Sequence, residues 1–105
     1  MVFIRYALMS PKPRQEQRVR EIIDELIRFQ RMQDGFIAAY RLEPDEHAAR
    51  GQIGRISIWE SEEKANPVAH NQHHISLQSE LRLVVEGSTH EEHAFQGMQP
   101  GEDGT

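Results

Sequence analysis

The chain of 105 residues contains no cysteine. This absence excludes disulfide bonds, thiolate catalysis and metal centres ligated by cysteine. Basic residues are also few, since 12 Lys and Arg stand against 17 Asp and Glu and give a formal net charge of -5. Because nucleic-acid binding requires a basic face, which this sequence does not offer, we expect no nucleic-acid partner.

Long apolar runs are absent as well. A helix that spans a bilayer takes roughly 18 to 20 apolar residues in a row, and no segment approaches that length. The first five residues lack the basic segment and long apolar core of a signal peptide. We therefore expect a cytoplasmic protein with no membrane partner, folded as one domain over residues 1–97 with a flexible tail over 98–105.

Alternating apolar residues predict four strands. The clearest alternation places Ile53, Arg55, Ser57 and Trp59 on one face of a strand that runs over 53–59. The other strands are expected over residues 2–9, 36–42 and 89–95. A polar loop over 43–51 should connect the second strand to the third.

Two helical regions are expected between these strands. Apolar residues recur every three or four positions over about 14–33, which predicts an amphipathic helix. Gly35 fits the left-handed stop of this helix. Ser61 is suited to cap a second helical region over 62–85, which Pro67 should bend or split.

The order of the elements predicts an α+β, ferredoxin-like βαββαβ fold, an antiparallel sheet with two helices on one face. The first strand, however, is apolar on both faces. Its even positions carry Val2, Ile4, Tyr6 and Leu8, and its odd positions carry Phe3, Ala7 and Met9. Two helices can cover only one face of the sheet, so we predict a homodimer packed sheet against sheet.

A spaced pattern of residues extends this prediction. It comprises Gly35-Phe36 before the second strand, Trp59-Glu60-Ser61 after the third, and Ala65, His70, His73 and His74 in the helical region that follows. With this pattern, residues 2–96 resemble the antibiotic biosynthesis monooxygenase-like (ABM) domains of the dimeric α+β barrel superfamily. The resemblance implies a homodimeric barrel whose sheets face one another, with a pocket in each protomer between sheet and helices.

The resemblance also implies a chemistry. Characterised members of the family oxidise polycyclic aromatic substrates with oxygen and no cofactor, or cleave haem, and others that are similar in sequence have no established activity. Haem cleavage needs an Asn on the first strand and a Trp within the second helix. Here the first strand offers Arg5, Tyr6 and Ala7, and the tryptophan is Trp59 at the end of a strand. We therefore expect a cofactor-independent monooxygenase that acts on a hydrophobic aromatic small molecule.

Histidines are the candidate catalytic residues. In such a reaction a base removes a proton from a phenolic or enolic substrate, whose carbanion then passes an electron to oxygen, and histidine suits this step. His70 and His74 lie one helical turn apart, and whichever turns toward the sheet is the candidate base. The residues expected to shape the pocket and hold the oxyanion are Arg5, Tyr6, Tyr40 and Trp59.

Other interpretations stay open at this point. The histidines are ordinary helix-surface residues if the protein is a non-catalytic small-molecule-binding or stress-related module with the same fold. A haem or metal binder is a third interpretation, because His70 and His74 could chelate an ion with help from the last strand, where His90 and Glu92 share one face and Glu91 and His93 the other. No recognised metal-site spacing is present, so we predict no metal ligand. Arg5 either binds an anionic ligand or pairs with an acidic side chain across the dimer.

Overall fold

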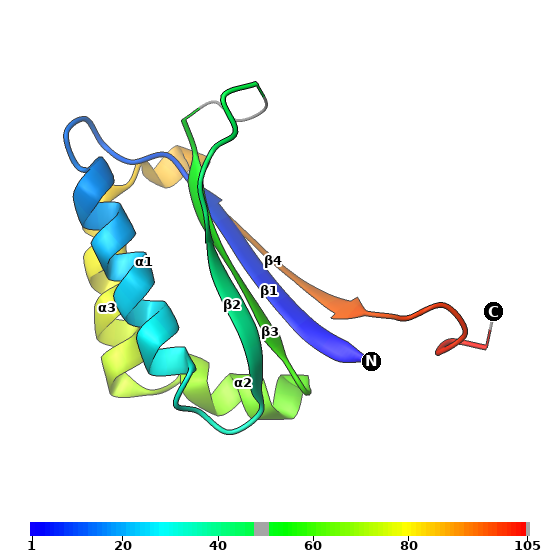
Figure 1. The fold of residues 1–105 in the computed structure, drawn as a ribbon. Helices are drawn as coiled ribbons and strands as arrows, with labels where there is room; N and C mark the ends of the chain where they lie inside the picture. Colours follow the sequence, from blue (N-terminus) through cyan, green and yellow to red (C-terminus); the bar gives the residue numbers. More distant parts are fainter. Residues whose placement is uncertain (48–50, 105) are drawn as a thin grey trace.

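The computed structural model describes residues 1–47 and 51–104. The elements in chain order are β1 (Val2–Met9), α1 (Glu16–Gln30), β2 (Phe36–Leu42), β3 (Ile53–Trp59), α2 (Glu62–Ala69), α3 (Gln72–Val84), the short 3-10 helix η1 (Gly87–Thr89) and β4 (Glu91–Gly97) (Figure 1). All strand pairs are antiparallel, and the strand order is β2-β3-β1-β4. This is the ferredoxin-like α+β fold that the sequence predicts. Part of the loop expected over 43–51 lies outside the described residues.

The three α-helices lie on one side of the sheet (Figure 1). On that side, the odd positions of β1 pack under α1 and α3, and Ala7 and Met9 are 2% and 0% exposed. The apolar stripe of α1 covers them, with Val19, Ile22, Ile23 and Leu26 fully buried. A second cluster joins Phe3 and Trp59 to Ala65 and Val68 of α2. The pattern of apolar residues in α1 thus fixes which face of the sheet is covered.

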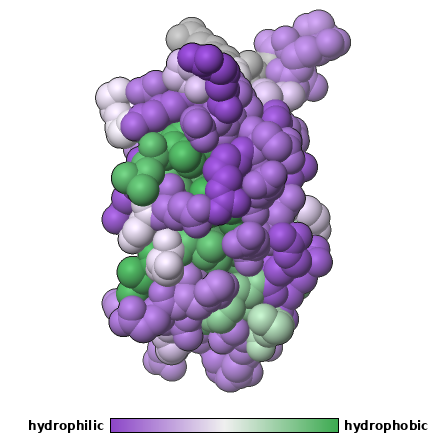
Figure 2. Space-filling model, turned by 90° about the vertical axis from the view of Figure 1, so that its left-hand side faces the viewer, coloured by the Kyte–Doolittle hydropathy of each residue, from purple (hydrophilic) through white to green (hydrophobic). Residues whose placement is uncertain are grey.

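The outer surface of the helices faces solvent. Figure 2 views the molecule from the helix side and shows a mostly hydrophilic surface with limited hydrophobic patches. Exposed apolar residues of α3 include Ile75 and Leu83. In the described part of the chain, no helix is long and apolar enough to cross a membrane.

The opposite face of the sheet carries no helix in the described part of the chain (Figure 1). The strand register places Ile4, Tyr6 and Leu8 of β1 there, across from Ile58, Ile56 and Gly54 of β3. Tyr40 and Phe95 lie on the same face and are 59% and 52% exposed. We call this surface, formed by the even positions of β1 and β3 with their partners on β2 and β4, the open face.

Strand β2 departs from the simple alternation. The register between β2 and β3 shifts between Phe36 and Ala38, as in a β-bulge. Phe36 therefore pairs with Trp59 and packs against the helix-side cluster, whereas Ala38 and Tyr40 point to the open face. Strict alternation over 36–42 would place Phe36 and Tyr40 on the same face, and the bulge instead puts them on opposite faces.

The second helical region is split, although not at Pro67. Helix α2 continues through Pro67, and the break falls at His70 and Asn71. The side chain of Asn71 accepts a hydrogen bond from the backbone N–H of His73 at 2.8 Å and caps α3. The predicted cap of α2 is confirmed, since Ser61 Oγ accepts from the N–H of Lys64 at 3.2 Å. Pro67 is the sixth of the eight residues of α2, and because it has no N–H it leaves the backbone oxygen of Glu63 without its intrahelical donor.

Chain ends and turns also differ slightly from expectation. Helix α1 ends at Gln30, and Gly35 follows four residues of turn with a φ of +84°, where a Cβ would lie 2.4 Å from that of Lys64. Strand β4 begins two residues later than predicted, after η1, and extends to Gly97, which pairs with Val2. Beyond it, Glu102 of the predicted tail lies 2.5 Å from the amino group of Met1.

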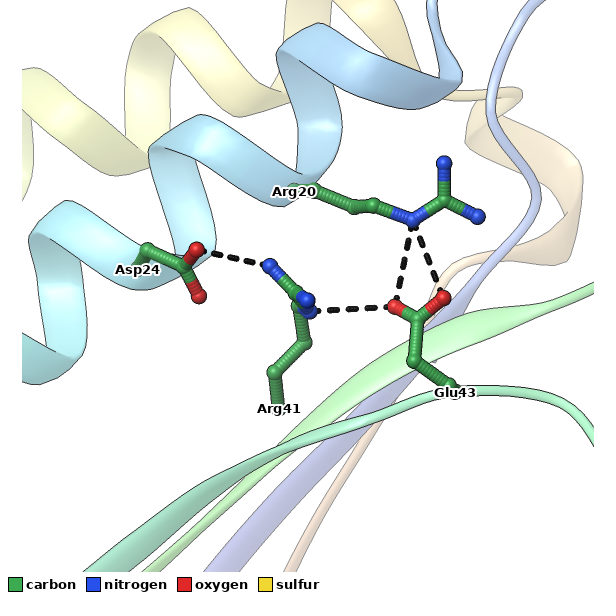
Figure 3. Close-up of polar contacts among 4 residues, drawn as sticks. All are labelled: Arg20, Asp24, Arg41 and Glu43. Atoms are coloured by element: carbon green, nitrogen blue, oxygen red, sulfur yellow. Dashed lines mark hydrogen bonds and ion pairs between the residues drawn. The ribbon is translucent and has the colours of Figure 1, made fainter.

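Polar contacts tie α1 to the edge strand β2. Figure 3 shows Arg41 between Asp24 of α1 and Glu43, with Arg20 on the far side of Glu43. Arg41 donates to Asp24 at 2.6 Å, and its Nε lies 3.0 Å from Glu43. Arg20 Nε donates to Glu43 at 2.9 Å. All four side chains are 30% to 42% exposed, so the network contributes modestly.

Candidate functional site

A pocket of about 380 Å³ lies between the sheet and the helices. Its floor is made by the helix-side positions of β1, β3 and β4, and its walls by α2, α3 and the end of α1. The volume falls in the range of roughly 300–1,000 Å³ that small-molecule sites occupy. Apolar lining residues include Ala7, Trp59, Ala65 and Val68, and polar ones include Arg5, Gln30, Arg55, Ser57 and His74.

His74 is the buried titratable group of this pocket. It lies near the start of α3 on the face turned toward the sheet, and only 4% of it is exposed. Burial, followed by the positive charges of Arg55, Arg5 and His73, lowers the pKa of His74 to about 4. The imidazole is consequently neutral at pH 7.

The tautomer of His74 depends on Gln30, a buried residue at the end of α1. The Gln30 amide nitrogen lies 3.1 Å from His74 Nε2, and His74 Nδ1 is buried without a hydrogen-bond partner in the described residues. If the amide donates to Nε2, the proton sits on Nδ1, which becomes a donor. Turning the amide by 180° lets its oxygen accept from Nε2–H and leaves a lone pair on Nδ1. Gln30 thus selects between two chemical roles for Nδ1.

Two arginines enter the same pocket from neighbouring strands. Arg5 of β1 pairs across the sheet with Ser57, one step along from the Ala7–Arg55 pair, so the two arginines are diagonal neighbours. Arg5 donates to the side-chain oxygen of Asn66 at 2.8 Å, and its guanidinium lies 5.1 Å from the centre of the Phe3 ring. Its hydrogen-bond partner is therefore neutral.

Arg55 is the more buried of the two. Its side chain is 12% exposed, and its Nε is buried without a hydrogen-bond partner in the described residues. Its nearest carboxylate is Glu92 of β4, at a long 3.8 Å. Burial lowers the pKa of Arg55, opposed by Glu92 and reinforced by Arg5. A guanidinium always remains charged in proteins, so this one is an incompletely satisfied cation.

Glu92 is shared between the pocket and the surface. Its Oε1, the same oxygen that lies 3.8 Å from Arg55, also accepts from His90 Nε2 at 3.0 Å. Burial works to raise the pKa of Glu92, but His90 and Arg55 outweigh it and hold the pKa below its ordinary value. Glu92 is thus ionised at neutral pH and offsets part of the charge of Arg55.

Trp59 forms the apolar end of the pocket. It is 2% exposed, its indole N–H donates to Ser57 Oγ at 3.0 Å, and its ring meets Phe36 edge-on at 5.5 Å. With its polar atom satisfied by Ser57, the indole presents an apolar surface to the cavity.

The structure separates the residues that the sequence groups together. Arg5, Trp59 and His74 line the pocket. His70 is exposed and does not line it, and its Nδ1 lies 2.8 Å from the backbone oxygen of Asn66. Tyr40 points to the open face because of the bulge in β2.

Tyr6 occupies an intermediate position. It borders the pocket, but the strand register directs its ring to the open face, where it stacks on His93 at 5.0 Å and on Phe95 at 6.0 Å. The ring therefore belongs to the open face, whereas His74 lies on the helix side of the sheet.

Sequence reasoning missed Arg55 and Gln30 as site residues, and it considered Glu92 only as a possible metal ligand. In β3, an arginine that alternates with isoleucines would ordinarily be assigned to the solvent side. The available signal was that Arg55 and Ser57 occupy odd positions of the strand and so lie on the same face as Ile53 and Trp59. These two residues are 1% and 2% exposed. In the described part of the chain, no group of three or more His, Asp or Glu residues could hold a metal ion.

Comparisons with known proteins support the fold. No protein-family model matches the chain, and no curated protein matches it either. Among solved structures, a variant of SnoaB, a cofactor-independent oxygenase from Streptomyces nogalater, is 12% identical, with a TM-score of 0.79 over 93% of this chain and 94% of that one. A conserved protein from Methanosarcina mazei Go1 is 14% identical, with a TM-score of 0.82 over 93% and 94%.

A structure described as an antibiotic biosynthesis monooxygenase is 15% identical, with a TM-score of 0.76 over 94% of this chain and all of that one. The resemblance predicted from Gly35-Phe36 and Trp59-Glu60-Ser61 is thus confirmed at the level of the fold, and the chain is similar throughout its length to structures of the antibiotic biosynthesis monooxygenase type.

Proposed function

We propose that the protein is a cofactor-independent monooxygenase, with His74 as the general base, that oxidises a hydrophobic aromatic molecule carrying a phenol or enol. One observation supports the proposal more strongly than the others. A buried neutral histidine with an unpartnered Nδ1 lines a pocket that also holds two arginines. The pocket lies in the same fold as a cofactor-independent oxygenase.

The reaction begins with proton transfer. With Gln30 accepting from Nε2–H, the lone pair of His74 Nδ1 takes a proton from the substrate. A conjugate acid with a pKa of about 4 makes His74 a weak base. Arg5 and Arg55 compensate, because positive charge beside the substrate oxygen lowers the pKa of the substrate itself.

Oxygen then reacts with the substrate anion. The carbanion gives one electron to O₂, and the substrate radical and superoxide combine to form a carbon–oxygen bond. The resulting peroxide takes the proton back from His74. Loss of the second proton from the same carbon then forms the C=O bond as the oxygen–oxygen bond breaks, and that proton leaves with the departing hydroxide as water. For a substrate CH₂ group the balance is CH₂ plus O₂ to C=O plus H₂O, with no external reductant. The apolar wall of Trp59, Ala65 and Val68 keeps bulk water away from the radical pair.

The working form in this proposal is a homodimer. The open face exposes Tyr40 and Phe95 and aligns them with Ile4, Ile56 and Ile58, an apolar surface that two copies would cover by packing sheet against sheet. The dimer would also cover the ring of Tyr6, which borders the pocket through β1.

Oxygen uptake tests the proposed reaction. Wild-type protein, His74→Gln and His70→Ala are incubated with hydroxyanthrones and hydroquinones at pH 7.5 in an oxygen electrode, and the rate in buffer alone is subtracted. General-base catalysis contributes roughly 10²- to 10⁴-fold, so we expect His74→Gln to lose at least 100-fold and His70→Ala to retain the wild-type rate. No uptake by the wild type across the panel, or an undiminished rate in His74→Gln, would contradict the proposal.

A non-catalytic small-molecule-binding module is the second candidate. The observation that favours it is the low pKa of His74, because Nδ1–H would then serve as a neutral hydrogen-bond donor. Ligand binding without oxygen uptake under the same conditions identifies this alternative.

A further inference from the structure

The charge of the pocket indicates what kind of molecule it takes. Two arginines and a neutral histidine face one carboxylate, Glu92, which Arg55 already shares with His90. The pocket is therefore positively charged, and because the Arg55 side chain is only 12% exposed, water screens its charge weakly.

Hydrogen-bond donors outnumber acceptors in the same place. Among the residues that the structure describes, Arg55 Nε has no partner, the contact of Arg55 with Glu92 is long, and Arg5 is held by the neutral amide of Asn66. A buried guanidinium whose partners are few or distant is destabilising. A ligand that brings negative charge compensates the two guanidiniums, whereas a neutral hydrocarbon leaves them uncompensated.

Geometry favours a carboxylate as that group. A guanidinium presents a planar fork of donors that matches the two oxygens of a carboxylate. Arg55 projects from the middle of β3, and Arg5 is its diagonal neighbour on β1. The remainder of the lining, from Trp59 to Val68, is apolar and suits an aromatic ring.

We propose that the pocket binds an aromatic carboxylate, anchored by the guanidinium of Arg55 with help from Arg5, while the ring lies against Trp59. This inference deepens the proposed function and rests on it for the choice of pocket. The carboxylate orients the ring and leaves the hydroxyl or enol that reacts free to meet His74. The substrate class is narrowed from aromatic compounds in general to aromatic acids.

Binding can be measured without turnover. Trp59 is the only tryptophan of the chain and lines the pocket, so its fluorescence reports occupancy. Under anaerobic conditions the protein is titrated with 2-naphthoate and with 2-naphthalenemethanol, a neutral molecule of nearly equal size, and the affinities are checked by calorimetry. We expect 2-naphthoate to bind at least about 10-fold more tightly.

Variants test whether Arg55 is responsible for the preference for 2-naphthoate. Arg55→Met should weaken 2-naphthoate roughly 10- to 100-fold and leave 2-naphthalenemethanol within about 2-fold, because only the charged contact is lost. Arg28→Met removes an exposed arginine of α1 that does not line this pocket and should change neither affinity. If Arg55→Met does not fold, Arg55→Lys keeps the charge, loses the fork and should lower the affinity for the carboxylate alone.

Equal affinities for the two naphthalenes, no binding of either, or an Arg55→Met variant with undiminished affinity for 2-naphthoate would each overturn the inference. These results are independent of oxygen uptake. A protein that binds 2-naphthoate selectively and consumes no oxygen keeps this inference and loses the proposed oxygenase function. A protein that oxidises neutral hydroxyanthrones and shows no carboxylate preference does the reverse.

Discussion

The two faces of the sheet are built from alternate residues of the same strands, yet they differ in kind. On the helix side, β1 and β3 present Arg5, Arg55 and Ser57 beside buried apolar residues. On the open face the same strands present isoleucine, leucine and tyrosine. In a solitary protein the more apolar face would be expected inside. This inverted arrangement is what the proposed dimer would produce, with a polar pocket on the helix side and a second copy covering the open face.

The largest expected effect concerns the open face. Placing a charge there by Phe95→Glu should weaken self-association about 1,000-fold or more, because each dimer would bury two unpaired carboxylates. Leu83→Glu makes the same change at a more exposed residue, 73% against 52%, on the outside of α3 and should have no effect. Light scattering across a dilution series measures both. Wild-type protein that is monomeric at micromolar concentration would refute the dimer.

Truncating one side chain on each face compares how much the helix side and the open face contribute to the stability of a single chain. Leu26→Ala on the helix side removes a fully buried side chain and should cost about 2–5 kcal/mol of the free energy of unfolding. Tyr40→Ala, made in the monomeric Phe95→Glu background, should cost about 1 kcal/mol or less, since the side chain is 59% exposed. Urea denaturation compares the two. Equal costs would mean that the open face is already packed within one chain.

The next effect in size is the pH dependence of the free energy of unfolding that His74 causes. Since the pKa of His74 falls from 6.5 to about 4 on folding, the unfolded chain binds the extra proton between these values. Stability should thus decrease as the pH falls from 6.5 to 4, by up to about 3 kcal/mol. Arg55, Arg5 and His73 oppose protonation of His74, and Glu92 favours it.

His74→Gln isolates the contribution of His74 to this pH dependence, because every other titrating group is common to both proteins. The difference in unfolding free energy between wild type and His74→Gln should change over this pH window and stay constant above pH 7. Parallel stability curves from pH 7 to pH 4 would show that the folded protein does not exclude the charged imidazole.

The smallest effect on stability is expected from the polar network that joins α1 to β2. Arg41→Met breaks contacts to Asp24 and Glu43 (Figure 3) and should cost about 1 kcal/mol or less, declining further in 0.5 M salt. Arg31→Met, an exposed arginine beyond the end of α1, provides the comparison. A loss above about 2 kcal/mol would mean that this network supports the fold as much as the core does.

Periodicity predicted the helices, the strands and their order, because burial of one stripe per helix and alternate residues per strand leaves a clear pattern in Val19 through Ile27 and in Ile53 through Trp59. It could not place the bulge at Phe36–Ala38, since a single inserted residue costs little and has no distinctive composition. That one residue moved Tyr40 from the expected pocket to the open face.

The candidate site was predicted less completely than the fold. The spacing of His70 and His74 suggested a shared helix face, but the break capped by Asn71 places His70 at the end of α2 and turns His74 inward. Arg55 and Glu92 are 37 residues apart in sequence and reach one pocket only because β1 lies between their strands. A pattern of neighbouring residues in the sequence cannot reveal a pair that meets only after the strands have assembled into a sheet.

The most direct test of the account is the titration of His74 followed by NMR of its ring nitrogens. A neutral imidazole enclosed beside two arginines should titrate with a pKa of about 4, and its Nδ1 should respond to 2-naphthoate at pH 7. An imidazole that titrates near the ordinary value of about 6.5, with ring nitrogens whose signals do not change on addition of the ligand, would contradict a positively charged pocket built around a buried His74.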